Sequence, residues 1–358
     1  MTVRANPPRD QSLDAFRGTD VLLMIIVNVQ GSDAAAFTAL KHAEWNGLTF
    51  ADLVFPVFLL IVGLSTPLAL DRPGIIISWS AILKRAFWLF MIGVGLSWLI
   101  RPSFDPDLIR WTGVLQRIAI GYLACAVVVI ATRGSGVAAA VATALLVFHT
   151  LTLLYVGSPP SIAPGMGVSG WLDQNFIPGR VLRTTWEAEG ILSTFPAIAN
   201  GLIGVAIMRW VQARKVGAMR LGGVGVVLII AGLLLSPIVP INKNLWTASF
   251  ALVTSGIGVA FWALLKGLWP RVGGTLLMRW VVTLGQAALT LYVVHHLLIA
   301  IIVRKMPSGE KLWKILYDAL AGTGLNPAVA SLLFACVAAA ISCAVLPWLK
   351  RRGWILKV

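Results

Sequence analysis

The sequence is poor in charged residues, since Asp, Glu, Lys and Arg make up only 12% of its 358 residues. Soluble domains carry about 25% charged and about 45–50% apolar residues, whereas this chain is 58% hydrophobic. So little charge leaves too little polar surface to face water, which excludes a soluble enzyme, a secreted disulfide scaffold and a disordered chain. The composition predicts an all-α, polytopic helical membrane protein.

Cysteine is also scarce, and its placement excludes two further classes of site. The three cysteines, Cys125, Cys336 and Cys343, lie inside apolar stretches without paired spacing. We expect them to be small buried hydrophobic side chains rather than disulfides or metal ligands. His295 and His296 are adjacent and therefore point about 100° apart on a helix, so we expect no metal site there and one of them lining a polar cavity.

Long apolar runs fill most of the chain. A spanning helix needs about 20 mostly apolar residues, and we predict ten spans with both termini in the cytoplasm. No linker or fixed-period repeat divides them, so residues 1–358 are expected to form a single transmembrane domain. The predicted spans are 19–39, 50–70, 77–100, 112–132, 137–156, 190–208, 221–238, 245–265, 280–303 and 327–347.

The distribution of Lys and Arg predicts the orientation. With the N-terminus inside, the inner connections hold 18 of the 29 basic residues and four of the 14 acidic ones, which satisfies the positive-inside rule for an inner (plasma) membrane. Anionic lipid accounts for this excess by itself, and a cytosolic polyphosphate ligand such as a nucleotide or coenzyme A would use the same face. Nucleic acid is not expected, because no basic run interleaves with aromatic residues.

The first outer connection carries the densest group of reactive side chains. His42 and Glu44 lie there, and Asp52 follows at the start of the second span, where a carboxylate needs a partner. His42 can be that partner, because a carboxylate orients an imidazole that accepts a proton. Asn28, in the first span, can supply an amide donor to the same cavity. The alternative is an exposed histidine beside a helix cap made by Asp52 or Thr49.

Arg117 is a permanent cation inside the fourth predicted span. It must face protein, water or a ligand rather than lipid. Two interpretations stay open: a pair with a buried Asp, or a group that positions an anionic or carbonyl ligand.

The long outer segment 157–189 is rich in Pro, Gly and Trp. Loops of that length are usually functional or disordered, so it is a candidate cover for an outward cavity, although a membrane-interface belt explains its tryptophans equally well. Groups suited to sugar binding occur in it: Trp171, Asp173, Asn175, Arg180, Trp186, Glu187 and Glu189.

Six short motifs, in order along the chain, resemble the heparan-α-glucosaminide N-acetyltransferase family, including its short bacterial members. Any one of them is weak evidence, but the set is specific. They are SLDAFRG at 12–18, HAEWNGLT at 42–49, ADLVFP at 51–56, GVLQR at 113–117, EGILST at 189–194 and PINKNLWT at 240–247.

The resemblance implies a transmembrane acyltransferase that takes acetyl from cytosolic acetyl-CoA and transfers it to the amine of a glucosamine-type sugar on the outer side. It implies that His42 is catalytic, with Asn28 as its partner, and we add Asp52 as the carboxylate that orients His42. We expect coenzyme A to be held by Arg17, Arg85, Arg117 and Arg279. We expect the sugar to be bound by Trp45, Asn46, Glu187, Glu189, Asn242 and Lys243.

A second function class fits the same composition. An amino-sugar permease with this fold and no acyl transfer would also have intramembrane polar groups and an outward cavity. No two-half repeat supports it, and a transporter has no stated need for the group around His42. Besides the sugar, we expect membrane lipid as a partner, and the sequence leaves a homodimer open.

Overall fold

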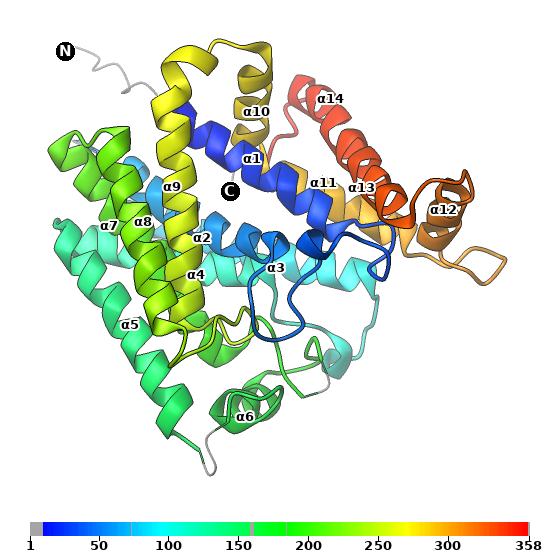
Figure 1. Cartoon of the computed structure of the whole chain (residues 1–358), viewed down its shortest axis with the longest axis horizontal. Coiled ribbons are helices and arrows are strands. Elements are labelled where there is room, and N and C mark those ends of the chain that lie inside the picture. The colour runs from blue at the N-terminus through cyan, green and yellow to red at the C-terminus, as the bar shows by residue number, and fades with distance from the viewer. Residues whose placement is uncertain (1–9, 73, 158–160, 184, 357–358) are drawn as a thin grey trace.

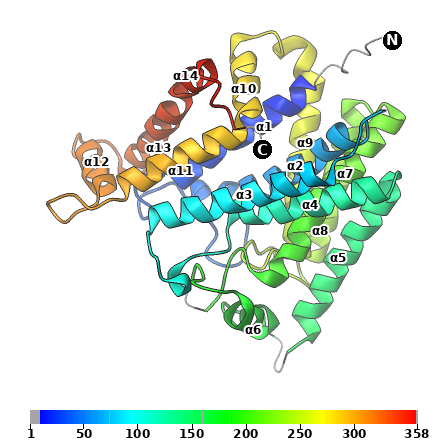
Figure 2. The same cartoon turned by 180° about the vertical axis from the view of Figure 1, so that it is seen from behind.

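The computed structural model describes residues 10–72, 74–157, 161–183 and 185–356, and every regular element within them is helical (Figure 1, Figure 2). Parts of the predicted cover, 158–160 and 184, lie outside the described residues, as do Arg4, Arg9 and Lys357 of the inner charge count. The helices are α1 Gln11–Asn28, α2 Phe50–Leu70, α3 Trp79–Ile100, α4 Val114–Ala131, α5 Ser135–Tyr155, α6 Gly167–Phe176, α7 Ile191–Arg214, α8 Ala218–Leu235, α9 Ala248–Val272, α10 Leu276–Gln286, α11 Ala288–Ile302, α12 Leu312–Ala321, α13 Pro327–Ala344 and α14 Leu346–Arg351, with 3-10 turns η1 Thr38–Leu40 and η2 Pro106–Leu108.

Eight helical stretches of the described chain are long and apolar enough to cross a membrane. They are α2, α3, α4, α5, α7, α8, α9 and the stretch Pro327–Arg351, which combines α13 and α14. The pair α10 and α11 adds a ninth if it counts as one span, although it bends by 79° at its break. The prediction of an all-helical, multi-pass membrane protein is therefore confirmed, while ten spans and cytoplasmic termini remain predictions.

The first predicted span, 19–39, was wrong in its position. Helix α1 starts eight residues earlier, because the Asp10 side chain accepts a hydrogen bond from the Leu13 amide and caps the helix. It ends at Asn28 instead of 39, and Gly31 beyond it packs closely against Tyr317 and Ser331. Helix α1 contains three charged residues among its 18, and for that reason it is not one of the eight stretches that are apolar enough to cross a membrane.

The connections gather at two opposite ends of the bundle, as their alternation along the chain predicts. At one end Arg209 of α7 pairs with Asp71 after α2 (Nε–Oδ2 2.8 Å) and donates to Thr132 after α4. At the other end Trp45 donates to the carbonyl of Ile162. The Trp45–Ile162 contact joins two connections that were predicted to lie on the same side.

Glycines allow the central helices to touch through their backbones. A Cβ atom at Gly63 of α2 would overlap the carbonyl oxygen of Gly201 in α7, and one at Gly18 of α1 would overlap that of Val281 in α10. These close approaches hold α1 and α2 in the middle of the bundle, with α10 and α7 against them. The bundle thereby brings the two ends of α2 into contact with different groups of polar side chains.

The last described residues return to the bundle. After α14, the amide of Leu356 donates a hydrogen bond to the Thr290 hydroxyl of α11 (3.0 Å). The Leu356 side chain then forms part of the wall of a cavity that is described below.

Candidate active site

The loop that carries His42 is anchored by the connection between α8 and α9. The Gly47 amide donates to the carbonyl of Ile241 (2.7 Å), and the Asn242 side-chain amide donates to Asn46 Oδ1 (3.0 Å). Gly47 has a φ of 119°, a backbone conformation that favours glycine. The Asn-Gly turn thus fixes the loop to a segment almost 200 residues away in the chain.

His42 and Asp52 are in direct contact. Nδ1 of His42 lies 2.8 Å from Oδ1 of Asp52, whose side chain is fully buried, whereas the imidazole is 49% exposed. The other oxygen, Oδ2, accepts hydrogen bonds from the amides of Ala43 and Thr49 and from the Thr49 hydroxyl. Asp52 therefore caps α2 and contacts His42 with the same carboxylate, so the two alternatives drawn from the sequence are both present.

Lys243 is the third member of this cluster. Its Nζ lies 2.9 Å from Nδ1 of His42 and 3.3 Å from Oδ1 of Asp52. Burial lowers the pKa of the Lys243 ammonium below its ordinary value, although Asp52 and Glu189 act against that shift. Nδ1 can serve only one partner at a time, because it either carries a proton or offers a lone pair. When Nδ1–H donates to Asp52, Nε2 is left as the basic atom.

Asn28 is not placed beside this cluster. It is the last residue of α1 and is exposed, and no described residue makes a hydrogen bond with its side chain. The expected position near the middle of a helix fails because α1 ends so early.

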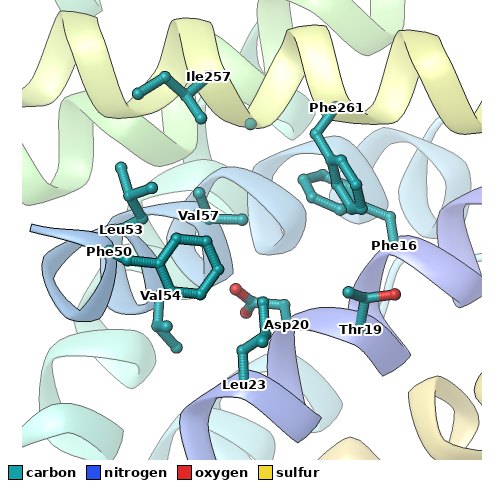
Figure 3. Close-up of a pocket in the computed structure, with 11 residues that line it drawn as sticks. Phe16, Thr19, Asp20, Leu23, Phe50, Leu53, Val54, Val57, Ile257 and Phe261 are labelled. Carbon is teal, nitrogen blue, oxygen red and sulfur yellow. The ribbon is translucent and has the colours of Figure 1, made fainter. Parts of the chain in front are cut away.

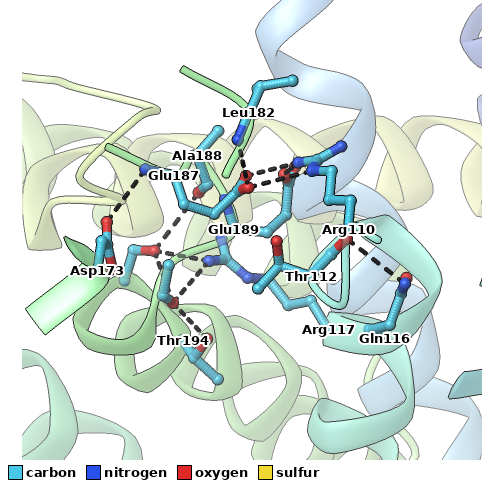
Figure 4. A network of polar contacts seen from close by, with 12 residues as sticks. Arg110, Thr112, Gln116, Arg117, Asp173, Leu182, Glu187, Ala188, Glu189 and Thr194 are labelled. Atoms are coloured by element: carbon cyan, nitrogen blue, oxygen red, sulfur yellow. Dashed lines mark hydrogen bonds and ion pairs between the residues drawn. The ribbon is translucent and has the colours of Figure 1, made fainter. Parts of the chain in front are cut away.

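A second polar network is centred on Arg110 (Figure 4). Arg110, in the connection before α4, donates to both oxygens of Glu187 and to Glu189. Burial raises the pKa of the Glu187 carboxyl, but the hydrogen bonds and charge of Arg110 outweigh it and lower that pKa to about 2. Burial raises the pKa of Glu189. The side chain of Glu187 is fully buried, whereas that of Glu189 is 11% exposed.

Asp173 of α6 ties this network to the start of α7. Its two carboxylate oxygens accept hydrogen bonds from the amides of Glu187 and Ile191, each at 3.1 Å. Burial raises the pKa of Asp173 to about 6. The predicted cover segment 157–189 is thus attached to the bundle by carboxylates in its second half.

Arg117 belongs to this outer network. Its guanidinium donates to the Gly190 carbonyl and the Ser193 hydroxyl, and it lies 5.0 Å from the centre of the Trp246 ring. It lies near the start of α4, at the end of the bundle where Glu187 and Glu189 lie, and its role in binding coenzyme A stays a prediction. The sequence also suggested a buried Asp partner, whereas backbone, hydroxyl and ring contacts hold the cation.

A cavity of about 400 Å³ runs along α2 from the opposite end. Its walls on α2 extend from Ala69 to Phe58, which corresponds to about 16 Å of helix at 1.5 Å per residue. Arg17 and Arg85 lie in its wall, and Arg17 donates to Ser65 (2.6 Å) and pairs with Asp14. The guanidinium of Arg85 lies 4.6 Å from the centre of the Tyr122 ring.

Arg279 does not join these two cations. It is exposed on α10 and donates twice to the carbonyl of Gly274. It is absent from the residues that line the cavity, so its expected contact with coenzyme A stays a prediction that the cavity does not support.

Tyr292 connects the cavity with the outer polar groups, and the sequence did not single it out. It lines the cavity and lies within electrostatic reach of Glu189, which in turn acts on Lys243. Neither His295 nor His296 is among the lining residues of this cavity. Tyr292, three residues before His295 on the same helix, was a signal that the sequence offered.

The six residues expected to bind sugar fall into two groups. In the first group the polar atoms already have partners within the protein. The side chains of Asn242 and Asn46 hydrogen-bond to each other, and Glu187 accepts hydrogen bonds from Arg110. Trp45 donates to the Ile162 carbonyl and packs edge-on against Trp186. Glu189 and Lys243 retain some exposure and lie within electrostatic reach of each other. No group of three or more His, Cys, Asp or Glu side chains suited to a metal ion occurs in the part of the chain that the structure describes.

Comparisons with known proteins agree with the motifs. The family model described as "Heparan-alpha-glucosaminide N-acetyltransferase, catalytic" matches residues 9–232. The chain is similar to the heparan-alpha-glucosaminide N-acetyltransferase of Homo sapiens, with 29% identity over 347 residues, covering 74% of this chain and 50% of the relative. The protein of the same name from Mus musculus is 26% identical over 346 residues, covering 75% and 51%. The chain spans about half the length of these curated relatives.

Proposed function

The chain belongs to the heparan-α-glucosaminide N-acetyltransferase family, and on that basis we propose that it transfers an acetyl group from acetyl-CoA to the amine of a glucosamine-type sugar. One observation carries the proposal: a cavity with two arginines approaches from one end of α2, and a His–Asp–Lys cluster lies at the other end. We propose that the arginine end is cytoplasmic and the cluster faces outward, in an inner membrane, so that transfer crosses the bilayer.

His42 is the general base in this proposal. With Nδ1–H held by Asp52, Nε2 is free to take a proton from the sugar ammonium or from the attacking amine. The amine nitrogen forms a bond to the acetyl carbon, the carbon–sulfur bond breaks, and the proton removed from nitrogen compensates the thiolate of coenzyme A. Asp52 stabilises the imidazolium that exists between these steps. An acetyl-His intermediate is an alternative route with the same residues.

Arg17 and Arg85 bind the phosphates of coenzyme A in this proposal. Both cations line the cavity, and charge-assisted hydrogen bonds to phosphate are among the strongest polar contacts. The remaining walls of the cavity are mainly apolar, which suits a long thin arm reaching toward Tyr292. Asn28, exposed at the end of α1, would assist His42 only after the connection that follows it moves.

Glu189 and Lys243 contact the sugar in this proposal. Glu189 offers a carboxylate to the hydroxyl or ammonium groups of the sugar. Lys243 also forms an ion pair with Asp52. Trp45, Asn46, Asn242 and Glu187 position the loops instead, because their polar atoms are used within the protein. The single domain, with segment 157–189 as its cover, encloses this site.

The test is acetyl transfer by protein reconstituted in liposomes, with acetyl-CoA and glucosamine on opposite sides of the membrane. We expect product with the wild type and none above background with His42→Ala. Lys41→Ala is the matched control, since Lys41 bonds the Ala34 carbonyl in the same loop and should leave the rate unchanged. Equal rates for wild type and His42→Ala contradict the role of His42.

The same liposomes separate the enzyme from a permease. Uptake of labelled N-acetylglucosamine in the absence of coenzyme A, together with no transfer in its presence, would contradict the acetyltransferase and favour transport.

A further inference from the structure

A second, smaller cavity lies between α1, α2 and α9, outside the proposed active site (Figure 3). It measures about 150 Å³, and its walls are apolar except for two residues of α1, Thr19 and Asp20. The hydroxyl of Thr19 already donates to the Ala15 carbonyl (3.1 Å). Asp20 is therefore the only lining residue with an uncommitted polar group.

Asp20 is buried without compensation. Asp20 is 4% exposed, and its Oδ2 atom has no hydrogen-bond partner among the described residues. Figure 3 shows the carboxylate pointing away from α1, toward Phe50 and Val57 across the cavity. The lining residues include no Lys, Arg or His. Buried carboxyl groups are normally paired or hydrogen-bonded, and no described residue that lines this cavity supplies a partner to Oδ2 of Asp20.

The cavity opens toward the outside of the bundle. Phe50 is exposed, and the rim residues Leu53 and Ile257 are partly exposed. These rim residues belong to α2 and α9, two helices that are long and apolar enough to span a membrane. A ligand that enters over this rim passes apolar side chains, so it must be mostly apolar.

We propose that this cavity binds a compact hydrophobic amine, with its ammonium group paired to Asp20 and its apolar body against Phe16, Val54 and Phe261. Apolar cavities of about 150 Å³ hold a benzene-sized molecule, which limits the body of the ligand. An ammonium cation compensates the carboxylate in charge and donates hydrogen bonds to it. An alcohol supplies one donor and leaves the charge uncompensated, so it binds more weakly.

The site is distinct from the one proposed for acetyl transfer, and it does not depend on that function. Phe50 and Asp52 lie two residues apart at the start of α2, and they face different surroundings: Phe50 the amine cavity, Asp52 the contact with His42. Binding is therefore measured directly, without any assay of acetyl transfer.

Benzylamine, benzyl alcohol and toluene are matched probes, since they share the ring and differ in the polar group. Their binding to the full chain in lipid nanodiscs is measured by saturation-transfer NMR and by calorimetry. We expect saturable binding of benzylamine that is at least about tenfold tighter than that of benzyl alcohol, as a charge-assisted hydrogen bond implies. Asp20→Asn should reduce the affinity for benzylamine to that for benzyl alcohol. The control Asp33→Asn, which changes an exposed loop carboxylate, should leave the affinity for benzylamine unchanged.

Ile257→Phe adds a ring at the partly exposed rim and should prevent binding of all three probes. Equal benzylamine affinity in wild type and Asp20→Asn overturns the proposal, as does alcohol binding as tight as amine binding. If Asp20→Asn does not fold, the ranking of the three probes in wild type and its loss in Ile257→Phe decide the question.

Discussion

Nδ1 of His42 lies 2.8 Å from Oδ1 of Asp52, and Asp52 is at the same time the residue that closes the capping box of α2 with Thr49. The first turn of the helix and the orientation of the imidazole therefore depend on one carboxylate. Any change at Asp52 alters both, and the two effects have to be separated by experiment.

Replacing Asp52 by Asn tests that double role. One of the two oxygens becomes an NH₂ group, which cannot accept a hydrogen bond. The single remaining oxygen can accept from the amides of Ala43 and Thr49 or from His42, but not from both sides. We expect turnover to fall by about a hundredfold or more while the Kd for coenzyme A stays within about twofold of wild type. Steady-state rates and calorimetry measure the two. A variant with normal turnover would show that Asp52 serves only the helix.

Replacing Lys243 by Met tests the charge beside the imidazole. The Lys243 ammonium contacts both Nδ1 of His42 and Oδ1 of Asp52, and its removal leaves the buried Asp52 carboxylate without that cation. We expect the rate of acetyl transfer to fall by about tenfold or more, as measured by steady-state kinetics. Lys41→Met removes a cation from the same loop that does not contact His42, and its rate should match wild type. A wild-type rate for Lys243→Met would contradict this electrostatic role.

The Arg110–Glu187 pair predicts an acid-labile outer network. The hydrogen bonds and the charge of Arg110 lower the pKa of Glu187 from 4.5 to about 2, so the pair stabilises the fold above pH 4.5. That stabilisation is lost as the pH falls from 4.5 toward 2. Hydrogen-exchange protection of residues 182–190, corrected for the intrinsic exchange rate, should fall over this range.

Two variants separate this pair from general acid unfolding. Arg110→Met should lose protection already at neutral pH, because it leaves the Glu187 carboxylate buried and unpaired. The matched control is Arg183→Met, since Arg183 is exposed and its backbone amide, rather than its side chain, bonds Trp186. Protection of 182–190 that stays constant down to pH 2 in wild type would be incompatible with the pair as described.

Arg17 and Arg85 are tested by comparing two acyl donors. Acetyl-CoA carries the nucleotide phosphates, whereas S-acetylpantetheine has the same thioester without them. We expect Arg85→Met to weaken the binding of acetyl-CoA by about tenfold or more and to leave the binding of S-acetylpantetheine unchanged. Arg279→Met should change neither, because Arg279 lies away from the cavity. Equal weakening of both donors would place Arg85 in the packing of the cavity instead of at a phosphate.

Local sequence was sufficient wherever the cause of a structure is local. Helix α2 has the predicted bounds because Thr49 and Asp52 cap an uninterrupted apolar run, and His42 meets Asp52 only ten residues away. Lys243 was singled out, but its contact with His42 joins residues 201 apart, and no pattern in the chain encodes that approach.

Other features depend on tertiary packing and could not be predicted. The 79° bend between α10 and α11 falls in a continuous apolar run, 280–303, in which nothing but Gln286 interrupts the hydropathy at the break. Arg110 joined no motif, although it binds Glu187 and Glu189 at a distance of more than 70 residues along the chain. The partners of Arg117 stayed open because periodicity gives depth along one helix but not the neighbours that surround it.

The return of the C-terminal segment to Thr290 sets the order in which the molecule is completed during synthesis. The wall of the arginine cavity includes Arg17 near the beginning of the chain and Leu356 near its end. A nascent chain in the membrane therefore has the His42–Asp52 contact available early, whereas the arginine cavity is finished only after residue 356 has been made. Ligands of that cavity consequently stabilise the finished protein and cannot assist the insertion of its first helices.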